Sequence, residues 1–281
     1  METWPIGVFT RLDGVRGFEL ARARELGIST IQLFAPRSPA RTDERARQIV
    51  DQLRQLEINL TAVFGGFEGE SYADILTVAR TVGLVPPQTR EERLVEMQSI
   101  ADFAHLLGCR VVALHLGLVP HETHDPQYLA AVAVTRALCD HCCRMGQALH
   151  LETGQESADV MLSFIRSVDR DNLFINFDPA NMILYGSGDP IAALKTLGSY
   201  VRSVHCKDAK WALRPGVDWG REVPLGEGDV GMEAFLQALK EIGYGGPLTI
   251  ECEFAEDVDR RYAEFQRAVN LLKTLKRKIL A

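Results

Sequence analysis

The sequence predicts an α/β protein with a single (β/α)8 barrel fold, a TIM barrel, formed by residues 1–281 as one domain. Short β-rich apolar runs alternate with longer amphipathic segments along the whole chain, and this alternation is typical of βαβ units and a parallel sheet. Eight such units can be counted, and a length of 281 residues is usual for an undivided α/β barrel. No linker, low-complexity segment or shift in composition divides the chain, so we expect one domain.

The strands are expected where apolar and β-branched residues cluster between turn signals. In chain order these clusters are residues 5–9, 30–35, 59–64, 110–116, 147–152, 173–178, 201–207 and 247–253. Between them, apolar residues recur at every third or fourth position, which predicts helices. The spacing is clear in the second expected helix, at Ile49, Leu53 and Leu56.

The starts of several helices carry recognisable signals. Asp125–Pro126 and Asp189–Pro190 each place a capping residue before a proline at the first helical position. Thr89 and Glu92 have the spacing of a capping box, in which each side chain bonds the backbone N–H of the other. We therefore expect helices to begin at these three points.

An open, doubly wound sheet is the alternative arrangement of eight βα units. That fold usually carries a glycine-rich first turn that binds a nucleotide, with the pattern G-x-G-x-x-G. The first βα turn of this chain reads TRLDGVRG and lacks the pattern. Closure into a barrel is favoured.

Composition excludes several classes of partner. The formal net charge of −7 provides no basic surface for a phosphate backbone, so we expect no nucleic-acid partner. No run of 18 apolar residues occurs and the first residues lack the features of a signal peptide, so we expect no membrane association. The six cysteines are not spaced as in a secreted disulfide scaffold, and we expect free thiols in a cytoplasmic protein.

Polar residues end four consecutive strands on the phase that faces the barrel axis. They are Glu152, Asp178, His205 and Glu251, and the residues between them and their inward neighbours are mostly large and apolar. Barrels of this kind carry their active sites at the carboxyl ends of the strands. Because three carboxylates and an imidazole cannot lie close together in a desolvated site without a cation, the pattern predicts one divalent metal ion. Carboxylates with one imidazole suit Mn²⁺, Mg²⁺, Co²⁺ or Zn²⁺.

The motifs at these strand ends resemble those of the xylose isomerase-like sugar isomerases and epimerases, a family that includes ketose 3-epimerases, hydroxypyruvate isomerase and inosose dehydratase. The motifs are HLETG at 150–154, NFDPAN at 176–181, VHCKD at 204–208, GEGD at 226–229 and GPLTIECE at 246–253. Each is modest alone, but their order on successive strands is specific, and the resemblance covers essentially the whole chain.

The resemblance implies a role for each residue of the expected site. Glu152, Asp178, His205 and Glu251 would be the metal ligands, with manganese the expected ion, and Glu152 and Glu251 would also be the catalytic acid and base. His115, Lys207, Asn181 and Glu156 would contact the substrate, although Glu156 could instead cap a helix. Asn181 stands where many of the epimerases have histidine. Lys207 could instead have a structural role, with Glu253 or Asp208 as its partner.

The leading functional hypothesis is a metal-dependent isomerase or epimerase of a small polyhydroxy ketone, working through a metal-bound enediolate. A dehydratase of the inosose or 3-dehydroshikimate type is the alternative, because the same intermediate can expel a β-hydroxyl. A barrel that binds sugar without catalysis is an alternative of another class. The sequence leaves the oligomeric state open, although barrels of this type often pair into homo-oligomers.

Other polar clusters have simpler explanations. CDHCC at 139–143 has the spacing of a zinc half-site but lies in an expected helix without a second pair, so packing is the better interpretation. HETHD at 121–125 is expected to be a solvated loop and helix cap. The long segment 209–230 is expected to be a loop, and its Trp211 and Trp219 could either cover the substrate or pack against the barrel.

Overall fold

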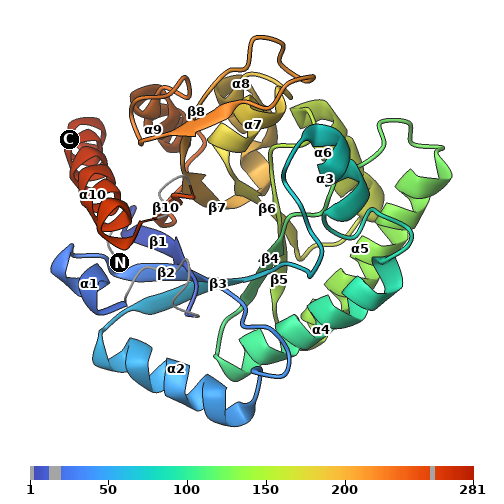
Figure 1. Cartoon of the computed structure of the whole chain (residues 1–281), viewed down its shortest axis with the longest axis horizontal. Coiled ribbons are helices and arrows are strands. Elements are labelled where there is room, and N and C mark those ends of the chain that lie inside the picture. The colour runs from blue at the N-terminus through green and yellow to red at the C-terminus, as the bar shows by residue number, and fades with distance from the viewer. Residues whose placement is uncertain (1–2, 13–19, 254–256) are drawn as a thin grey trace.

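Eight parallel strands close into a barrel in the computed structural model, which describes residues 3–12, 20–253 and 257–281 (Figure 1). Neighbouring strands follow the order β1-β10-β7-β6-β5-β4-β3-β2, and β2 pairs with β1 to close the ring. The barrel strands are β1 Ile6–Thr10, β2 Thr30–Phe34, β3 Asn59–Gly65, β4 Val111–Leu114, β5 Ala148–Glu152, β6 Leu173–Phe177, β7 Val201–Cys206 and β10 Leu248–Ile250. Each lies within or beside a strand expected from the sequence, which confirms the barrel and excludes the open sheet.

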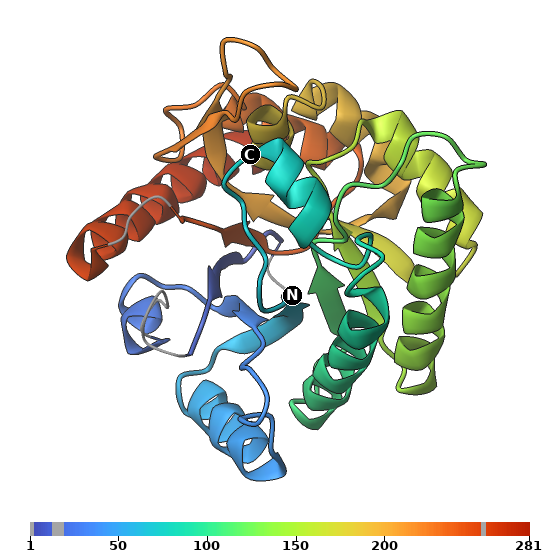
Figure 2. The same cartoon turned by 45° about the vertical axis from the view of Figure 1, so that its right-hand side comes forward.

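Helices surround the barrel and cover the apolar outer face of its strands. They are α1 Leu20–Glu25, α2 Asp43–Gln55, α3 Ile75–Thr81, α4 Arg90–Leu106, α5 Pro126–Arg144, α6 Ala158–Val168, α7 Pro179–Tyr185, α8 Pro190–Leu197, α9 Met232–Glu241 and α10 Val258–Leu280. Figure 2 shows α4 and α5 side by side on the outside of the barrel. The connections after β3 and β6 each contain an additional short helix, α3 and α7, on the carboxyl side of the barrel.

Two of the three expected helix caps form. Asp125 Oδ1 accepts a hydrogen bond from Gln127 N at 2.6 Å, and Asp189 Oδ1 accepts one from Ala192 N at 2.7 Å. The capping box predicted at the start of α4 does not form. Thr89 is the N-cap residue, but its side chain makes no capping hydrogen bond. With ψ at −1°, its backbone lies outside the extended region that directs a capping hydroxyl toward the helix amides.

The segment 209–230 is not the simple loop expected from the sequence. Strands β8 Asp208–Lys210 and β9 Arg221–Val223 pair in an antiparallel hairpin beside the barrel mouth. The buried Asp208 anchors the GEGD loop to the hairpin, because its carboxylate accepts the backbone N–H of Gly226 at 2.9 Å, of Gly228 at 3.0 Å and of Val230 at 3.2 Å. Asp208 is therefore committed to this loop and is not the partner of Lys207.

The two cysteines that give the CDHCC stretch its C-x₂-C spacing pack in the core, as expected. Cys139 and Cys142 lie on the buried side of α5, and all six cysteines are free thiols. None of the helices in the described ranges combines the length and the apolar content that a membrane span requires.

Candidate metal centre

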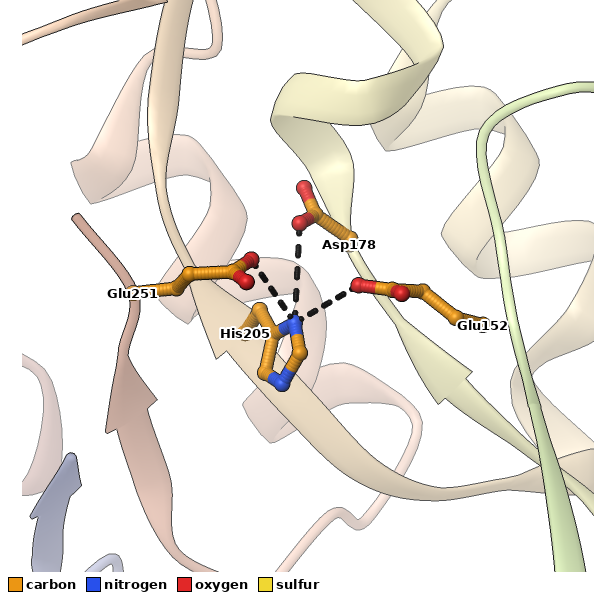
Figure 3. A group of neighbouring side chains, drawn as sticks. All are labelled: Glu152, Asp178, His205 and Glu251. Carbon is orange, nitrogen blue, oxygen red and sulfur yellow. Dashed lines mark hydrogen bonds and ion pairs between the residues drawn. The ribbon is translucent and has the colours of Figure 1, made fainter. Parts of the chain in front are cut away.

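Four polar side chains meet at the carboxyl end of the barrel. Glu152 is the last residue of β5, Asp178 follows β6, His205 lies near the end of β7, and Glu251 follows β10. Each offers a ligand atom, and these atoms lie within 4.8 Å of one another (Figure 3). All four residues are buried, so the structure brings the predicted ligand set into one desolvated cluster.

The imidazole of His205 lies at the centre of the cluster. Its Nδ1 is 2.9 Å from Glu152 Oε1, 3.1 Å from Glu251 Oε2 and 3.6 Å from Asp178 Oδ2. Its Nε2 lies 2.7 Å from the side-chain oxygen of Gln32, which can only accept a hydrogen bond. Nε2 therefore carries a hydrogen, and Nδ1 is the ring atom that faces the three carboxylates and can take up either an ion or a second proton.

Sequence reasoning did not single out Gln32. Its amide nitrogen donates to Asn176 Oδ1 at 3.2 Å, so a chain of side-chain hydrogen bonds runs from His205 on β7 through β2 to β6. The signal in the sequence was a glutamine in the middle of TIQLFA, flanked on both sides by large apolar residues.

Two local features hold Asp178 in place. As the N-cap of α7 it accepts Asn181 N at 2.9 Å through Oδ1, while its own N–H donates to the hydroxyl of Thr153 at 2.8 Å. Gly154, next to that threonine, has φ of +145°, and a Cβ there would lie 2.3 Å from the Cβ of Asn181. Glycine at this point lets α7 approach β5 closely.

The donor set fits a divalent cation. Asp178 Oδ2 is buried and has no hydrogen-bond partner among the described residues, although it is turned toward the cluster. Two ligands that bind one ion at right angles and at about 2.1 Å lie about 3 Å apart. The separations of His205 Nδ1 from Glu152 and Glu251, 2.9 and 3.1 Å, match this value. Glu152, Asp178, His205 and Glu251 can therefore hold a divalent metal.

The electrostatics of the cluster call for a positive charge at its centre. Burial raises the pKa of Glu152 to about 7. Burial would lower the pKa of His205, but the charge of Glu251 and hydrogen bonds to the carboxylates outweigh it and raise that pKa well above its ordinary value. A proton or a metal ion at Nδ1 meets the same need, so the two compete for this position.

Lys207 adds a fixed positive charge beside the cluster. Its Nζ lies 3.2 Å from Glu251 Oε2, 3.3 Å from Glu253 Oε2 and 3.5 Å from Asn181 Oδ1. Although burial opposes ionisation, Glu251 and Glu253 raise the pKa of Lys207 well above its ordinary value. Lys207 is therefore a charged ammonium, and Glu253 is the partner that the sequence allowed.

His115 belongs to an aromatic wall of the cavity. Its Nε2 lies 2.9 Å from the hydroxyl of Tyr185 and in close contact with the amide of Gln155, and Tyr72 meets its ring edge-on. Burial lowers the pKa of His115 to about 3, so the imidazole is neutral. Sequence reasoning missed Tyr185 and Tyr72, because neither lies at a strand end.

A cavity of about 850 Å³ opens above the cluster. Glu152 and Glu251 reach its surface, whereas Asp178 and His205 are fully buried beneath it. Asn181 and Lys207 also line the cavity, as does Trp219, whose ring packs at 4.6 Å from that of Tyr185. Trp211 is 38% exposed and is not among the lining residues.

Glu156 does not reach the cavity. Its Oε1 accepts the backbone N–H of Val119 at 2.7 Å, and the residue is absent from the described lining of the cavity. Burial raises the pKa of this carboxyl to about 8. Glu156 therefore links the loops that follow β4 and β5 and does not contact the substrate as expected. The alternative role as a helix cap is also not observed, because Ser157 caps α6.

Comparison with known proteins agrees with this geometry. The family model described as the xylose isomerase-like TIM barrel matches residues 20–275. The chain belongs to this family. A solved member, a xylose isomerase domain protein from Planctomyces limnophilus, is 53% identical, covers 99% of both chains and superposes with a TM-score of 0.96.

Two relatives of the family differ in their chemistry. An L-ribulose 3-epimerase from Methylomonas sp. (strain DH-1) is 26% identical over an alignment of 174 residues, and the match covers 58% of this chain and 57% of the relative. An inosose dehydratase from Lacticaseibacillus casei is 23% identical over an alignment of 181 residues, and the match covers 54% of this chain and 60% of the relative. The chain thus spans somewhat more than half the length of both, and the relatives include an epimerase and a dehydratase.

Proposed function

We propose that the protein is a metal-dependent isomerase or epimerase of a small polyhydroxy ketone. The observation that carries this proposal is the position of Glu152 and Glu251. These two carboxylates flank His205 from opposite sides and are the members of the cluster that reach the cavity (Figure 3). A substrate carbon held between them would have a carboxylate on each face, which is the arrangement that removal and return of a proton requires.

Glu152, Asp178, His205 and Glu251 would hold the ion, for which we propose manganese. When bound, a divalent cation polarises the carbonyl and the neighbouring hydroxyl of an α-hydroxyketone and acidifies the C–H bond between them. One glutamate then takes the proton from this carbon, and the other returns a proton on the opposite face. Asp178 and His205, buried below, have no access to the substrate and serve as ligands only.

Three further residues would orient the substrate. The Lys207 ammonium and the Asn181 amide lie side by side in the cavity and can bind hydroxyl oxygens. The neutral His115 faces Tyr185, so this pair offers both a donor and an acceptor to a hydroxyl group. These contacts would select a ligand with several hydroxyls near its carbonyl.

A dehydratase is the second candidate, favoured by Lys207. Its ammonium lies 3.2 Å from Glu251 and lines the cavity, where it could stabilise a departing hydroxide. The two reactions differ in their products, because elimination yields an unsaturated or diketo compound that absorbs ultraviolet light, whereas epimerisation yields none.

The test begins with elemental analysis of the purified protein. Manganese-loaded protein is then incubated in D2O with ketoses, inososes and small hydroxyketones, and deuterium at the carbon beside the carbonyl is followed by NMR together with ultraviolet absorbance. We expect about one equivalent of a divalent metal and exchange without an ultraviolet product. Absorbing product would favour the dehydratase, and a metal-loaded protein that exchanges no substrate would favour a binding protein.

The six free cysteines support a reducing compartment, and we propose the cytoplasm.

A further inference from the structure

The cavity is larger than the proposed reaction needs. Cavities of roughly 300–1,000 Å³ accommodate drug-sized ligands, and a free ketose has only about 12 non-hydrogen atoms. At about 850 Å³ the cavity lies near the upper end of that range. A ketose held between Glu152 and Glu251 would leave a large part of it unfilled.

The additional space lies across the barrel from the metal ligands. We name it the outer chamber, lined by Phe34, Arg37, Arg41, Phe67, Glu92 and Glu96. These residues come from the end of β2, the loops that follow β2 and β3, and the first two turns of α4. In the closed ring of eight strands, β2 lies opposite β6 and β3 lies opposite β7. The chamber therefore lies on the β2 and β3 side of the cavity, whereas Asp178 follows β6 and His205 lies on β7.

Four of the side chains that line the outer chamber are held in place by contacts with their neighbours. Arg41, whose side chain is only 5% exposed, donates to Pro36 O at 3.0 Å and pairs with Glu96 at 2.7 Å. The guanidinium of Arg11 covers the ring of Phe34 at 3.6 Å, and that of Arg93 covers the ring of Phe67 at 4.9 Å. A preformed wall of this kind loses little entropy on binding a ligand.

The charges of the chamber identify the chemistry of its ligand. Its two arginines, Arg37 and Arg41, are matched by two glutamates, Glu92 and Glu96. Four further charged residues line the cavity nearby and also balance, since Arg11 and Arg93 accompany Glu68 and Glu70. A phosphate would need an excess of positive charge. Paired donors and acceptors beside two aromatic rings suit a neutral group that carries hydroxyls and an apolar face.

We infer that the outer chamber binds a neutral sugar-like group joined to the reacting ketose, so that the substrate is a ketose-containing glycoside. This inference rests on the proposed function, because it places the ketose unit at Glu152 and Glu251. It adds a second binding region and excludes both free and phosphorylated monosaccharides as the preferred substrate.

The test compares ligands that differ only in what the chamber would hold. D-fructose, D-fructose 6-phosphate, and the fructose-containing disaccharides turanose, lactulose and isomaltulose are titrated calorimetrically into manganese-loaded protein. We expect at least one disaccharide to bind ten times more tightly than D-fructose. Fructose that binds as tightly as every disaccharide, or fructose 6-phosphate that binds tightest, overturns the inference.

Variants locate the effect in the chamber. Arg37→Ala and Glu92→Gln change cavity-lining side chains at solvent-accessible positions and should leave the fold intact. Both should reduce the disaccharide preference several-fold and leave the affinity for D-fructose unchanged. Arg47→Ala, at an exposed position of α2 that does not line the cavity, is the matched control and should change neither. A preference that survives both chamber variants also overturns the inference.

The inference and the proposed function fail in different ways. Deuterium exchange into these same sugars reports on the metal cluster, independently of affinity. If the protein catalyses exchange but binds fructose and the disaccharides with equal affinity, only the inference about the outer chamber is contradicted. A complete lack of exchange with every probe contradicts the proposed function, even if a disaccharide binds more tightly.

Discussion

Replacing Gln32 by methionine should weaken metal binding although Gln32 is not a ligand. In the native chain its side-chain oxygen accepts the hydrogen of His205 Nε2 at 2.7 Å, which keeps the lone pair of Nδ1 available for the ion. Methionine has nearly the same volume but no comparable acceptor. Without the acceptor, the imidazole hydrogen can move to Nδ1, where three carboxylates already attract it. In the native protein, displacement of the Nδ1 proton by the metal leaves an Nε2–H that Gln32 stabilises, whereas in the variant this buried Nε2–H has no acceptor and the tautomer that binds the metal is disfavoured.

The magnitude follows from the loss of one supporting hydrogen bond. Removing the partner of a metal-bound histidine typically lowers metal affinity about 10- to 100-fold, which is about 1.4 to 2.7 kcal/mol. The free energy of unfolding should also fall by about 1 to 3 kcal/mol, because Asn176 Oδ1 loses its donor inside the barrel. Gln32→Glu restores an acceptor for His205 and should recover most of the metal affinity.

Calorimetric titration of Mn²⁺ into metal-free protein measures the effect. Thr30→Val is the matched control, because Thr30 is two residues earlier on β2, is buried, and has a hydroxyl without a partner among the described residues. It should bind Mn²⁺ like the native protein. An affinity of Gln32→Met within twofold of the native value would refute the role assigned to Gln32.

Three further predictions concern pH and stability. Metal affinity should fall as the pH drops below about 7, because protons on Glu152 and His205 compete with the ion. Burial raises the pKa of Glu152 to about 7, which sets this range. Equal affinities at pH 5.5 and 8 would contradict this. Glu156 has a folded pKa of about 8 against an ordinary 4.5, so the native state binds the extra proton and loses stability as the pH rises through that window. Glu156→Gln should therefore raise the free energy of unfolding by roughly 2 to 4 kcal/mol at pH 9 and have little effect at pH 4. Denaturant unfolding that shows the same effect at both pH values would contradict the raised pKa of Glu156. Asp208→Ala should cost about 2 to 4 kcal/mol in the same assay because several backbone donors lose their acceptor, whereas Asp229→Ala, which removes half-exposed contacts, should cost less than about 1 kcal/mol.

The barrel and its cluster could be predicted from the sequence because both follow from local periodicity. Alternation along a strand decides which side chains face the axis, and parallel strands end on the same rim. This reasoning alone brings Glu152, Asp178, His205 and Glu251 together, and it also places Lys207 near Glu253.

Contacts that cross the barrel could not be predicted in this way. Gln32 and His205 are 173 residues apart, and their contact depends on the diameter of the closed barrel and on the side-chain rotamers. Glu156 was misplaced because its direction depends on the loop that follows β5, where strand alternation no longer applies. The backbone at Thr89 and the hairpin that holds Asp208 are likewise set by tertiary contacts, which override local signals.

The most direct test of the central claim is proton exchange catalysed by Glu152→Gln. The carboxamide keeps an oxygen near the position of a ligand but cannot take up a proton as a carboxylate does. With an exchanging substrate in D2O and bound Mn²⁺ measured in the same samples, we predict that this variant retains its fold and loses at least 100-fold in exchange rate, while Glu44→Gln on the exposed face of α2 exchanges at the native rate. A Glu152→Gln variant that exchanges at the native rate would contradict the assignment of this carboxylate to proton transfer.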